Sequence, residues 1–119
     1  MKTILLLDDD ENHLNQLKAA LSDDYNVVTA TQANIAFRLL GQSNPDLMVV
    51  DLNMPEVSGF DVLRVVKHKD KNFPVIMLTG ERDASTIVDA MKAGADDYVV
   101  KGSLDLVQNL KFRILNCFK

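Results

Sequence analysis

The sequence predicts an α/β fold in which five strands alternate with five helices. Short apolar segments recur along the chain, and each is followed by a longer segment whose apolar residues repeat every three or four positions. Glycine, proline or clustered polar residues separate the two kinds of segment. Regular alternation of this kind is typical of a parallel sheet with helices on both faces.

Five segments have the composition of strands. The third is apolar at four consecutive positions before Asp51, as in strands covered on both faces. Pro74 stands near the start of the fourth, where the missing backbone donor is tolerated. We expect the strands at residues 3–7, 25–30, 47–51, 73–78 and 98–100.

The first two helices have recognisable ends. Asp10 or Glu11 should begin the first helix, because acidic residues are favoured at a helix N-terminus. Thr31 is expected to cap the second helix, and Gly41 to end it. The residues expected to face the sheet are Leu14, Leu17 and Leu21 in the first helix and Ile35 and Leu39 in the second.

The last three helices follow the same scheme. Ser58 with Asp61 resembles a capping box at the start of the third helix. The fourth should span residues 84–93 and end at Gly94, and Ser103 should cap the fifth. The residues expected to be buried are Phe60, Leu63, Val65 and Val66 in the third helix, Ile87, Ala90 and Met91 in the fourth, and Leu106, Leu110 and Ile114 in the fifth.

Size and composition exclude several classes of protein. The 119 residues suit one domain, residues 1–119. A net charge of −4 leaves no basic surface for nucleic acid. A single cysteine, Cys117, excludes an internal disulfide and fits a reducing compartment. No apolar segment approaches the roughly 18 residues of a membrane span, and the N-terminus does not resemble a signal peptide. We therefore expect a cytoplasmic protein that does not bind membranes.

Carboxylates follow two of the predicted strands. Asp8 and Asp9 come directly after the first strand, and Asp51 ends the third. If these strands are neighbours, each like-charged pair at about 4 Å repels by roughly 4 kcal/mol at an effective dielectric constant of about 20. Because that is a large fraction of a domain's stability, the cluster needs a cation, and oxygen ligands alone suit Mg²⁺.

Two further polar residues end the remaining strands of this group. Thr79 ends the fourth strand and Lys101 the fifth. They converge with the carboxylates if the strand order is 2-1-3-4-5, the doubly wound, flavodoxin-like (βα)5 arrangement. A carboxylate, a metal, a hydroxyl and an amine at one place are suited to phosphoryl transfer onto aspartate.

The chain resembles the receiver domain of two-component response regulators over its whole length. Four segments in order carry the resemblance, each at a predicted strand end: residues 4–11, residues 50–55 with Gly59, residues 78–80 and residues 93–101. The resemblance implies that a histidine kinase or phosphotransfer protein donates a phosphoryl group in a Mg²⁺-dependent reaction. The domain then changes conformation and signals to a downstream protein or output domain that the sequence does not name. Apart from its own phosphorylation and dephosphorylation, no enzymatic activity is expected.

The resemblance also implies a role for each site residue. Asp51 is the expected phosphoacceptor. Mg²⁺ is expected to bind the carboxylates of Asp9 and Asp51 and the backbone carbonyl of Asn53, with Asp8 acting through a metal-bound water. Lys101 is expected to pair first with Asp51 and then with the phosphoryl group. No other cofactor is implied.

Two positions belong to the expected switch. The Thr79 hydroxyl should turn inward to bind a phosphoryl oxygen, and Tyr98 should then move inward. The surface formed by the fourth helix, fifth strand and fifth helix changes shape and contacts the partner; the domain is a monomer or a weak homodimer through that surface. Gly102 is a departure, because proline usually follows the lysine, and we expect a trans Lys101–Gly102 bond.

Three other functions are alternatives for this sequence. A haloacid-dehalogenase-like phosphatase needs a threonine after its aspartates, and Glu11 and Asn12 stand there instead. A flavodoxin-like flavin binder needs a phosphate-binding loop where this chain has three aspartates. A receiver-like interaction module that works without phosphorylation is the main alternative. His13 and His68 are expected to face solvent, with no role in phosphotransfer or metal binding.

Overall fold

The computed structural model describes residues 1–55, 57–80, 84–102 and 104–119. One five-stranded parallel sheet has the order β2-β1-β3-β4-β5, which confirms the predicted arrangement. The strands are β1 (Thr3–Leu7), β2 (Asn26–Ala30), β3 (Leu47–Asp51), β4 (Val75–Thr79) and β5 (Asp97–Val100). The helices are α1 (Glu11–Leu21), α2 (Ala33–Gln42), α3 (Gly59–Lys69), α4 (Ala84–Lys92) and α5 (Leu106–Cys117). The bounds of β1 and β3 are those predicted, and the bounds of β2, β4 and β5 differ from the prediction by one or two residues, within the usual uncertainty of element ends.

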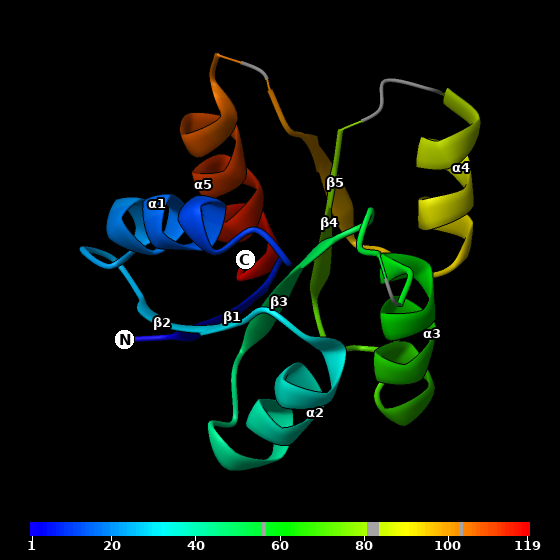
Figure 1. Ribbon diagram of the computed structural model, residues 1–119, viewed down its shortest axis with the longest axis horizontal. Helices are drawn as coiled ribbons and strands as arrows, with labels where there is room; N and C mark the ends of the chain where they lie inside the picture. Colours follow the sequence, from blue (N-terminus) through cyan, green and yellow to red (C-terminus); the bar gives the residue numbers. More distant parts are fainter. Residues whose placement is uncertain (56, 81–83, 103) are drawn as a thin grey trace.

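The helices cover both faces of the sheet. α1 and α5 pack on one face, and α2, α3 and α4 pack on the other (Figure 1). Successive residues of a strand point to opposite faces. Leu5 and Leu7 of β1 therefore join the core beneath α2 and α3, whereas Ile4 and Leu6 join the core beneath α1 and α5. This explains why the central strands are apolar at consecutive positions.

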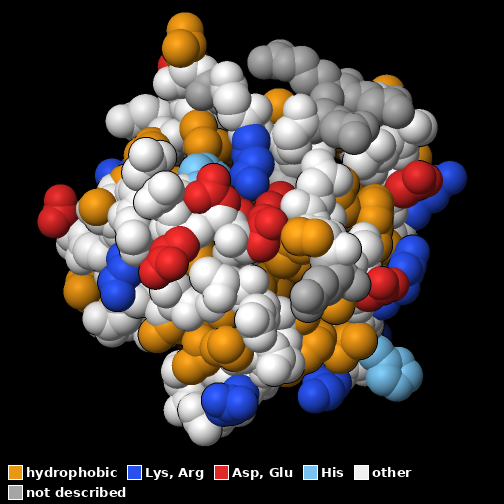
Figure 2. Space-filling model, viewed as in Figure 1, with side chains coloured by type: hydrophobic (Ala, Val, Ile, Leu, Met, Phe, Trp, Pro, Cys, Tyr) orange, Lys and Arg blue, Asp and Glu red, His pale blue; other side chains and the backbone are white. Residues whose placement is uncertain are grey.

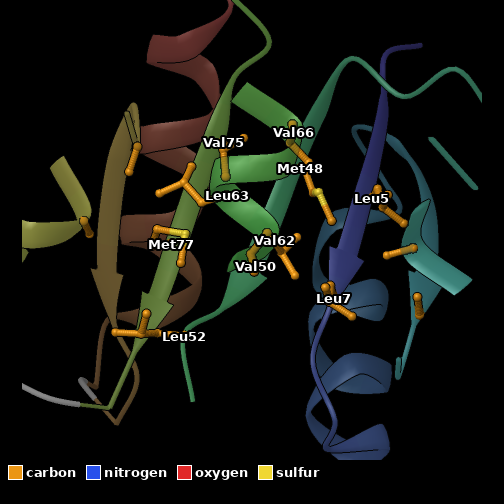
Figure 3. Packing of buried hydrophobic residues seen from close by; sticks show 14 residues of the cluster. Leu5, Leu7, Met48, Val50, Leu52, Val62, Leu63, Val66, Val75 and Met77 are labelled. Atoms are coloured by element: carbon orange, nitrogen blue, oxygen red, sulfur yellow. The ribbon is translucent and has the colours of Figure 1, made fainter. Parts of the chain in front are cut away.

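The larger core lies between the sheet and α3. Figure 3 shows Met48 and Val50 of β3 close to Val62 and Val66 of the helix, with Met77 of β4 beside them. All of these side chains are buried. Tight packing at this point fixes α3 against the strand that ends in Asp51.

The predicted ends of α2 were wrong. Gln32, not Thr31, occupies the N-cap position, and its side chain makes no capping hydrogen bond. The helix continues through Gly41 to Gln42, and Asn44 adopts the left-handed conformation two residues later, with φ of 47°. Asparagine tolerates this conformation better than most residues, so the glycine is not needed to end the helix. Ala36 is the buried residue, while Ile35 and Leu39 are half-buried.

The buried faces of α3 and α4 were partly mispredicted. In α3 the buried residues are Gly59, Val62, Leu63 and Val66. Phe60 is half-buried and Val65 is 41% exposed. Val65 lies about 100° around the helix from the buried Val66, on the side away from Leu63. In α4, Ala90 is buried, Ile87 is half-buried, and Met91 is 42% exposed.

The other helix ends agree better with the sequence. Asp10 caps α1, and its side chain accepts a hydrogen bond from the His13 N–H. Ser58 caps α3, accepting from the Phe60 N–H. Ser103, the predicted cap of the fifth helix, lies outside the described residues. Leu110 and Ile114 of α5 are buried and Leu106 is half-buried. No helix in the described part of the chain has the length and apolar character needed to cross a membrane.

Gly59 allows α3 to begin against the end of β3. A Cβ atom at this position would lie 2.5 Å from the Asp51 carbonyl oxygen and 2.7 Å from the Leu52 Cα. The Gly59 N–H donates to the Leu52 carbonyl oxygen at 3.0 Å. The close contact between the two backbones therefore holds the peptide that carries Asp51.

Candidate functional site

Three carboxylates meet at the carboxyl ends of β1 and β3. Leu7 and Val50 are partners in the sheet, so Asp8 and Asp51 follow on adjacent strands. Asp8, Asp9 and Asp51 each offer an oxygen, and these three oxygens lie within 4.8 Å of one another. Asp8 and Asp51 are only 1% and 2% exposed, whereas Asp9 faces solvent. Figure 2 shows acidic side chains gathered near the middle of the visible face, beside a basic side chain.

Lys101 places an amine between the two buried carboxylates. Its Nζ lies 3.0 Å from Asp8 Oδ2 and 3.1 Å from Asp51 Oδ2. The residue follows β5, where its N–H donates to the Thr79 carbonyl oxygen at 2.7 Å. One amine cannot neutralise two buried carboxylates together with the neighbouring Asp9, so the group keeps excess negative charge.

The pKa of Asp51 reflects this excess charge. Burial, followed by the charge of Asp8, raises the pKa of Asp51 from 3.8 to about 6. The Lys101 amine and the Asn53 N–H, which donates to Asp51 Oδ1 at 3.2 Å, oppose the rise. A divalent cation among these oxygens would relieve the repulsion. Because the donors are hard oxygens, the arrangement fits Mg²⁺.

Asp8 is more fully hydrogen-bonded than Asp51. Its Oδ1 accepts from the Asp10 N–H at 3.0 Å, and its Oδ2 lies 2.6 Å from His13 Nδ1. Burial raises the pKa of Asp8, but hydrogen bonds from His13, Asp10 and Lys101 outweigh burial and hold the pKa below its usual value. The ionised form of Asp8 is therefore stabilised more than the ionised form of Asp51.

The prediction that His13 faces solvent was wrong. Its side chain is only 16% exposed and contacts Asp8. Helical side chains point back toward the helix N-terminus, so a residue in the first turn of α1 reaches over the end of β1. A signal was present in the sequence: His13 precedes Leu17 by four residues and Leu21 by eight, which places it on the buried stripe. His68 is exposed, as predicted.

The comparison with known families agrees with this geometry. Residues 4–111 match the response regulator receiver domain family. The chain belongs to this family. Receiver domains of response regulators act in two-component signal transduction, and membership also argues against the phosphatase and the flavin binder.

Individual relatives show the same likeness. The chain is 36% identical over 102 residues to the transcriptional regulatory protein AfsQ1 of Streptomyces coelicolor, covering 85% of this chain and 45% of that protein. The chain thus spans less than half the length of this curated relative.

Two solved structures match the receiver over nearly all of its length. A response regulator receiver domain protein from Clostridium thermocellum has a TM-score of 0.89 at 32% identity, with 98% of this chain and 94% of that one covered. The response regulator TrrA from Thermotoga maritima, in complex with Mg²⁺-BeF, has a TM-score of 0.86 at 30% identity, with 98% and 99% covered.

The remaining predicted positions of the receiver lie on β4, on β5 and in the segment after β3. Thr79 is buried at the end of β4, the strand next to β3. Asn53 is exposed two residues after Asp51. Tyr98, in β5, is half-buried against the core beneath α3. The structure thus brings Thr79 and Lys101 to the same edge of the sheet as the carboxylates, as the strand order requires.

Gly102 distinguishes this receiver from the usual pattern. The Lys101–Gly102 peptide bond is trans, as expected, and Gly102 has φ of +79°. Proline is restricted to φ near −65°, so proline cannot replace glycine in this conformation. The backbone after Lys101 therefore takes a path that the usual proline would not allow.

Proposed function

We propose that this receiver accepts a phosphoryl group on Asp51 from a histidine kinase or a phosphotransfer protein. The observation that carries the proposal is the position of Asp51: it is buried, ends a central strand, and contacts Lys101 while two further carboxylates lie beside it. A carboxylate that served only to cap a loop would not need this charge arrangement. Perturbed carboxylates of this kind concentrate at functional sites.

The chemistry follows from the residues around Asp51. A carboxylate oxygen of Asp51 forms a bond to phosphorus while the N–P bond of the donor phosphohistidine breaks, and the electron pair of that bond stays on the imidazole nitrogen. Lys101 Nζ, 3.1 Å from Asp51 Oδ2, is placed to bind a phosphoryl oxygen once Asp51 carries an acyl phosphate. The Thr79 hydroxyl, at the end of the neighbouring strand, would bind another.

Mg²⁺ is part of the proposal. Asp9, Asp51 and the backbone carbonyl of Asn53 would hold the ion, and Asp8 would act through a metal-bound water. When bound, the ion would neutralise charge on the phosphoryl oxygens. Two observations support this assignment: the three close carboxylate oxygens, and the Mg²⁺-BeF complex of the similar TrrA protein.

The proposed output is a shift between two conformations. Phosphorylation populates the state that binds the phosphoryl group better, with Thr79 and Tyr98 moving together. The affected surface comprises α4, β5 and α5, where several apolar residues are exposed. A downstream protein or an output domain would bind this surface, and a weak homodimer could form through it. The domain would catalyse only its own phosphorylation and dephosphorylation.

Phosphorylation by a small phosphodonor tests the proposal directly. The protein is incubated with acetyl phosphate, with and without Mg²⁺, and weighed by intact mass spectrometry. We expect a gain of about 80 Da, the mass of one phosphoryl group, that requires Mg²⁺. Asp51→Asn should abolish the gain, because the amide is not a nucleophile. Asp23→Asn, at an exposed aspartate that follows α1, should leave the mass gain unchanged.

The same experiment decides against the alternative. If the folded wild-type protein gains no mass under any of these conditions, the receiver is an interaction module that works without phosphorylation. The path of the backbone at Gly102 would then be the first feature to examine.

A further inference from the structure

His13 is a half-buried polar group that the proposed phosphoryl transfer does not use. Its Nδ1 lies 2.6 Å from Asp8 Oδ2, and the side chain is 16% exposed. The three ligand oxygens that lie within 4.8 Å of one another come from Asp8, Asp9 and Asp51. Among the described residues, the imidazole contacts the Asp8 carboxylate. Any effect of His13 on a metal ion would therefore pass through Asp8.

The acceptor capacity of Asp8 is almost fully used. An ionised carboxylate accepts about four hydrogen bonds and donates none, so the hydrogen in the contact with His13 must be on Nδ1. Oδ2 accepts from His13 and from Lys101 at 3.0 Å, and Oδ1 accepts from the Asp10 N–H at 3.0 Å. One acceptor position remains, on Oδ1. Asp8 can thus serve one metal-bound water, but it cannot turn both oxygens toward a metal.

We propose that His13 is a specificity-determining residue of the metal site, because by holding Asp8 Oδ2 it makes the site prefer Mg²⁺ to Ca²⁺. This inference rests on the proposed function. Ca²⁺ takes six to eight oxygen ligands and often binds carboxylates through both oxygens, whereas Mg²⁺ keeps several waters and needs only one or two carboxylates. A carboxylate restricted to one free acceptor position suits the smaller ion. Without His13, Asp8 could rotate and supply Ca²⁺ with a further ligand.

Two substitutions separate hydrogen bonding from the shape and charge of the side chain. His13→Asn keeps a donor nitrogen at the same number of bonds from Cα as Nδ1, and the amide does not ionise. His13→Leu keeps the branch at Cγ but places a methyl group where the donor was. Leucine suits the buried stripe that continues to Leu17 and Leu21. His13→Ala provides the same comparison if the leucine variant does not fold.

The experiment measures dissociation constants for MgCl2 and CaCl2 at constant ionic strength, from the amide shifts of Asp9 and Asn53 in two-dimensional NMR spectra. The same spectra show whether each variant is folded. We expect the ratio of the Ca²⁺ to the Mg²⁺ constant to fall about fivefold in His13→Leu, the change produced by the loss of one ordinary hydrogen bond. His13→Asn should keep the wild-type ratio.

The outcomes distinguish this inference from the proposed function. If both constants change by the same factor in His13→Leu, or neither changes, His13 has only a structural role and the inference is wrong, while Mg²⁺ binding stands. If His13→Asn behaves like His13→Leu, the hydrogen bond is not the cause and the inference is also wrong. If the wild-type protein binds neither ion, the metal assignment of the proposed function fails, and the inference fails with it. Asp9→Asn serves as the control, and it should weaken the binding of both ions.

Discussion

The centre of the sheet and its β5 edge differ in how tightly they are packed. Every residue of β3 and β4 is buried, and so are four of the five in β1. In β5 only Val99 is buried, and in α4, all of which is described, only Ala90. The carboxylates are attached to the tightly packed centre, whereas Lys101 is supplied by the loosely packed edge. The site therefore joins a rigid region to one that can move at lower cost, an arrangement suited to a switch.

A pair of truncations should give the largest contrast between the two regions. Leu6→Ala removes a side chain that is buried between the sheet and the helices α1 and α5, and should lower the free energy of unfolding by about 2–5 kcal/mol. Met91→Ala, in the exposed part of α4, should change it by less than about 0.5 kcal/mol. Urea unfolding followed by circular dichroism measures both values. Equal losses in the two variants would show that the β5 edge is packed as tightly as the centre.

A second prediction concerns the strained carboxylate within the rigid centre. Because the pKa of Asp51 is raised to about 6 in the folded protein, the unfolded chain loses this proton first as pH rises, and folding becomes less favourable. The Asp51→Asn variant has no carboxyl group at this position and does not lose this stability as the pH rises. Between pH 4 and pH 7, its stability relative to the wild type should therefore increase by about 2 kcal/mol, since one pKa unit corresponds to about 1.4 kcal/mol and part of the effect is already present at pH 4.

Thermal or urea unfolding at several pH values, in EDTA, tests this prediction. The lowered pKa of Asp8 has the opposite sign: it contributes stability that is present above the unfolded-state pKa and lost as the pH falls through the folded-state pKa. Asp8 is present in both proteins, and removal of the neighbouring Asp51 charge lowers its pKa further, so the Asp8 contribution does not reduce the predicted difference. A difference that stays constant from pH 4 to pH 7 would mean that Asp51 is not strained.

The smallest expected effect concerns the connection after Lys101. Gly102→Ala should cost about 1 kcal/mol, because alanine is disfavoured at φ of +79° even though a Cβ there has no atom within 4 Å. Gly41→Ala is the matched control: it also has free space, lies inside α2, and should stabilise the protein by about 0.5–1 kcal/mol. Unfolding free energies of the two variants should thus change in opposite directions. Stabilisation by both would show that the left-handed conformation at Gly102 is not required.

The sequence predicts the sheet and the acidic group well for a clear physical reason. Burial on both faces forces the central strands to be apolar at every position, so the first polar residue, Asp8 or Asp51, marks the strand end. Parallel order then brings those ends together. Lys101 and Thr79 follow from the same rule on the next strands.

Features that depend on competition between neighbouring residues were harder to predict. Gly41 carries a stop signal, but the helix continues because Asn44 can take the left-handed conformation instead. Met91 and Val65 are apolar residues next to buried positions. Periodicity over so few turns does not distinguish such exposed residues from their buried neighbours. His13 was missed because a histidine beside polar residues suggests solvent, while its spacing from Leu17 indicates burial.

The contact between Gly59 and the peptide after Asp51 has a consequence for protein engineering. The first turn of α3 touches the backbone that carries Asp51, the proposed phosphoacceptor, so the helix and the aspartate are expected to move together. A rotation of α3 would carry Asp51 out of line with Lys101. Transfer of this group of three carboxylates to another parallel sheet would therefore require the helix as well, Gly59 included, because the helix holds the backbone that carries Asp51.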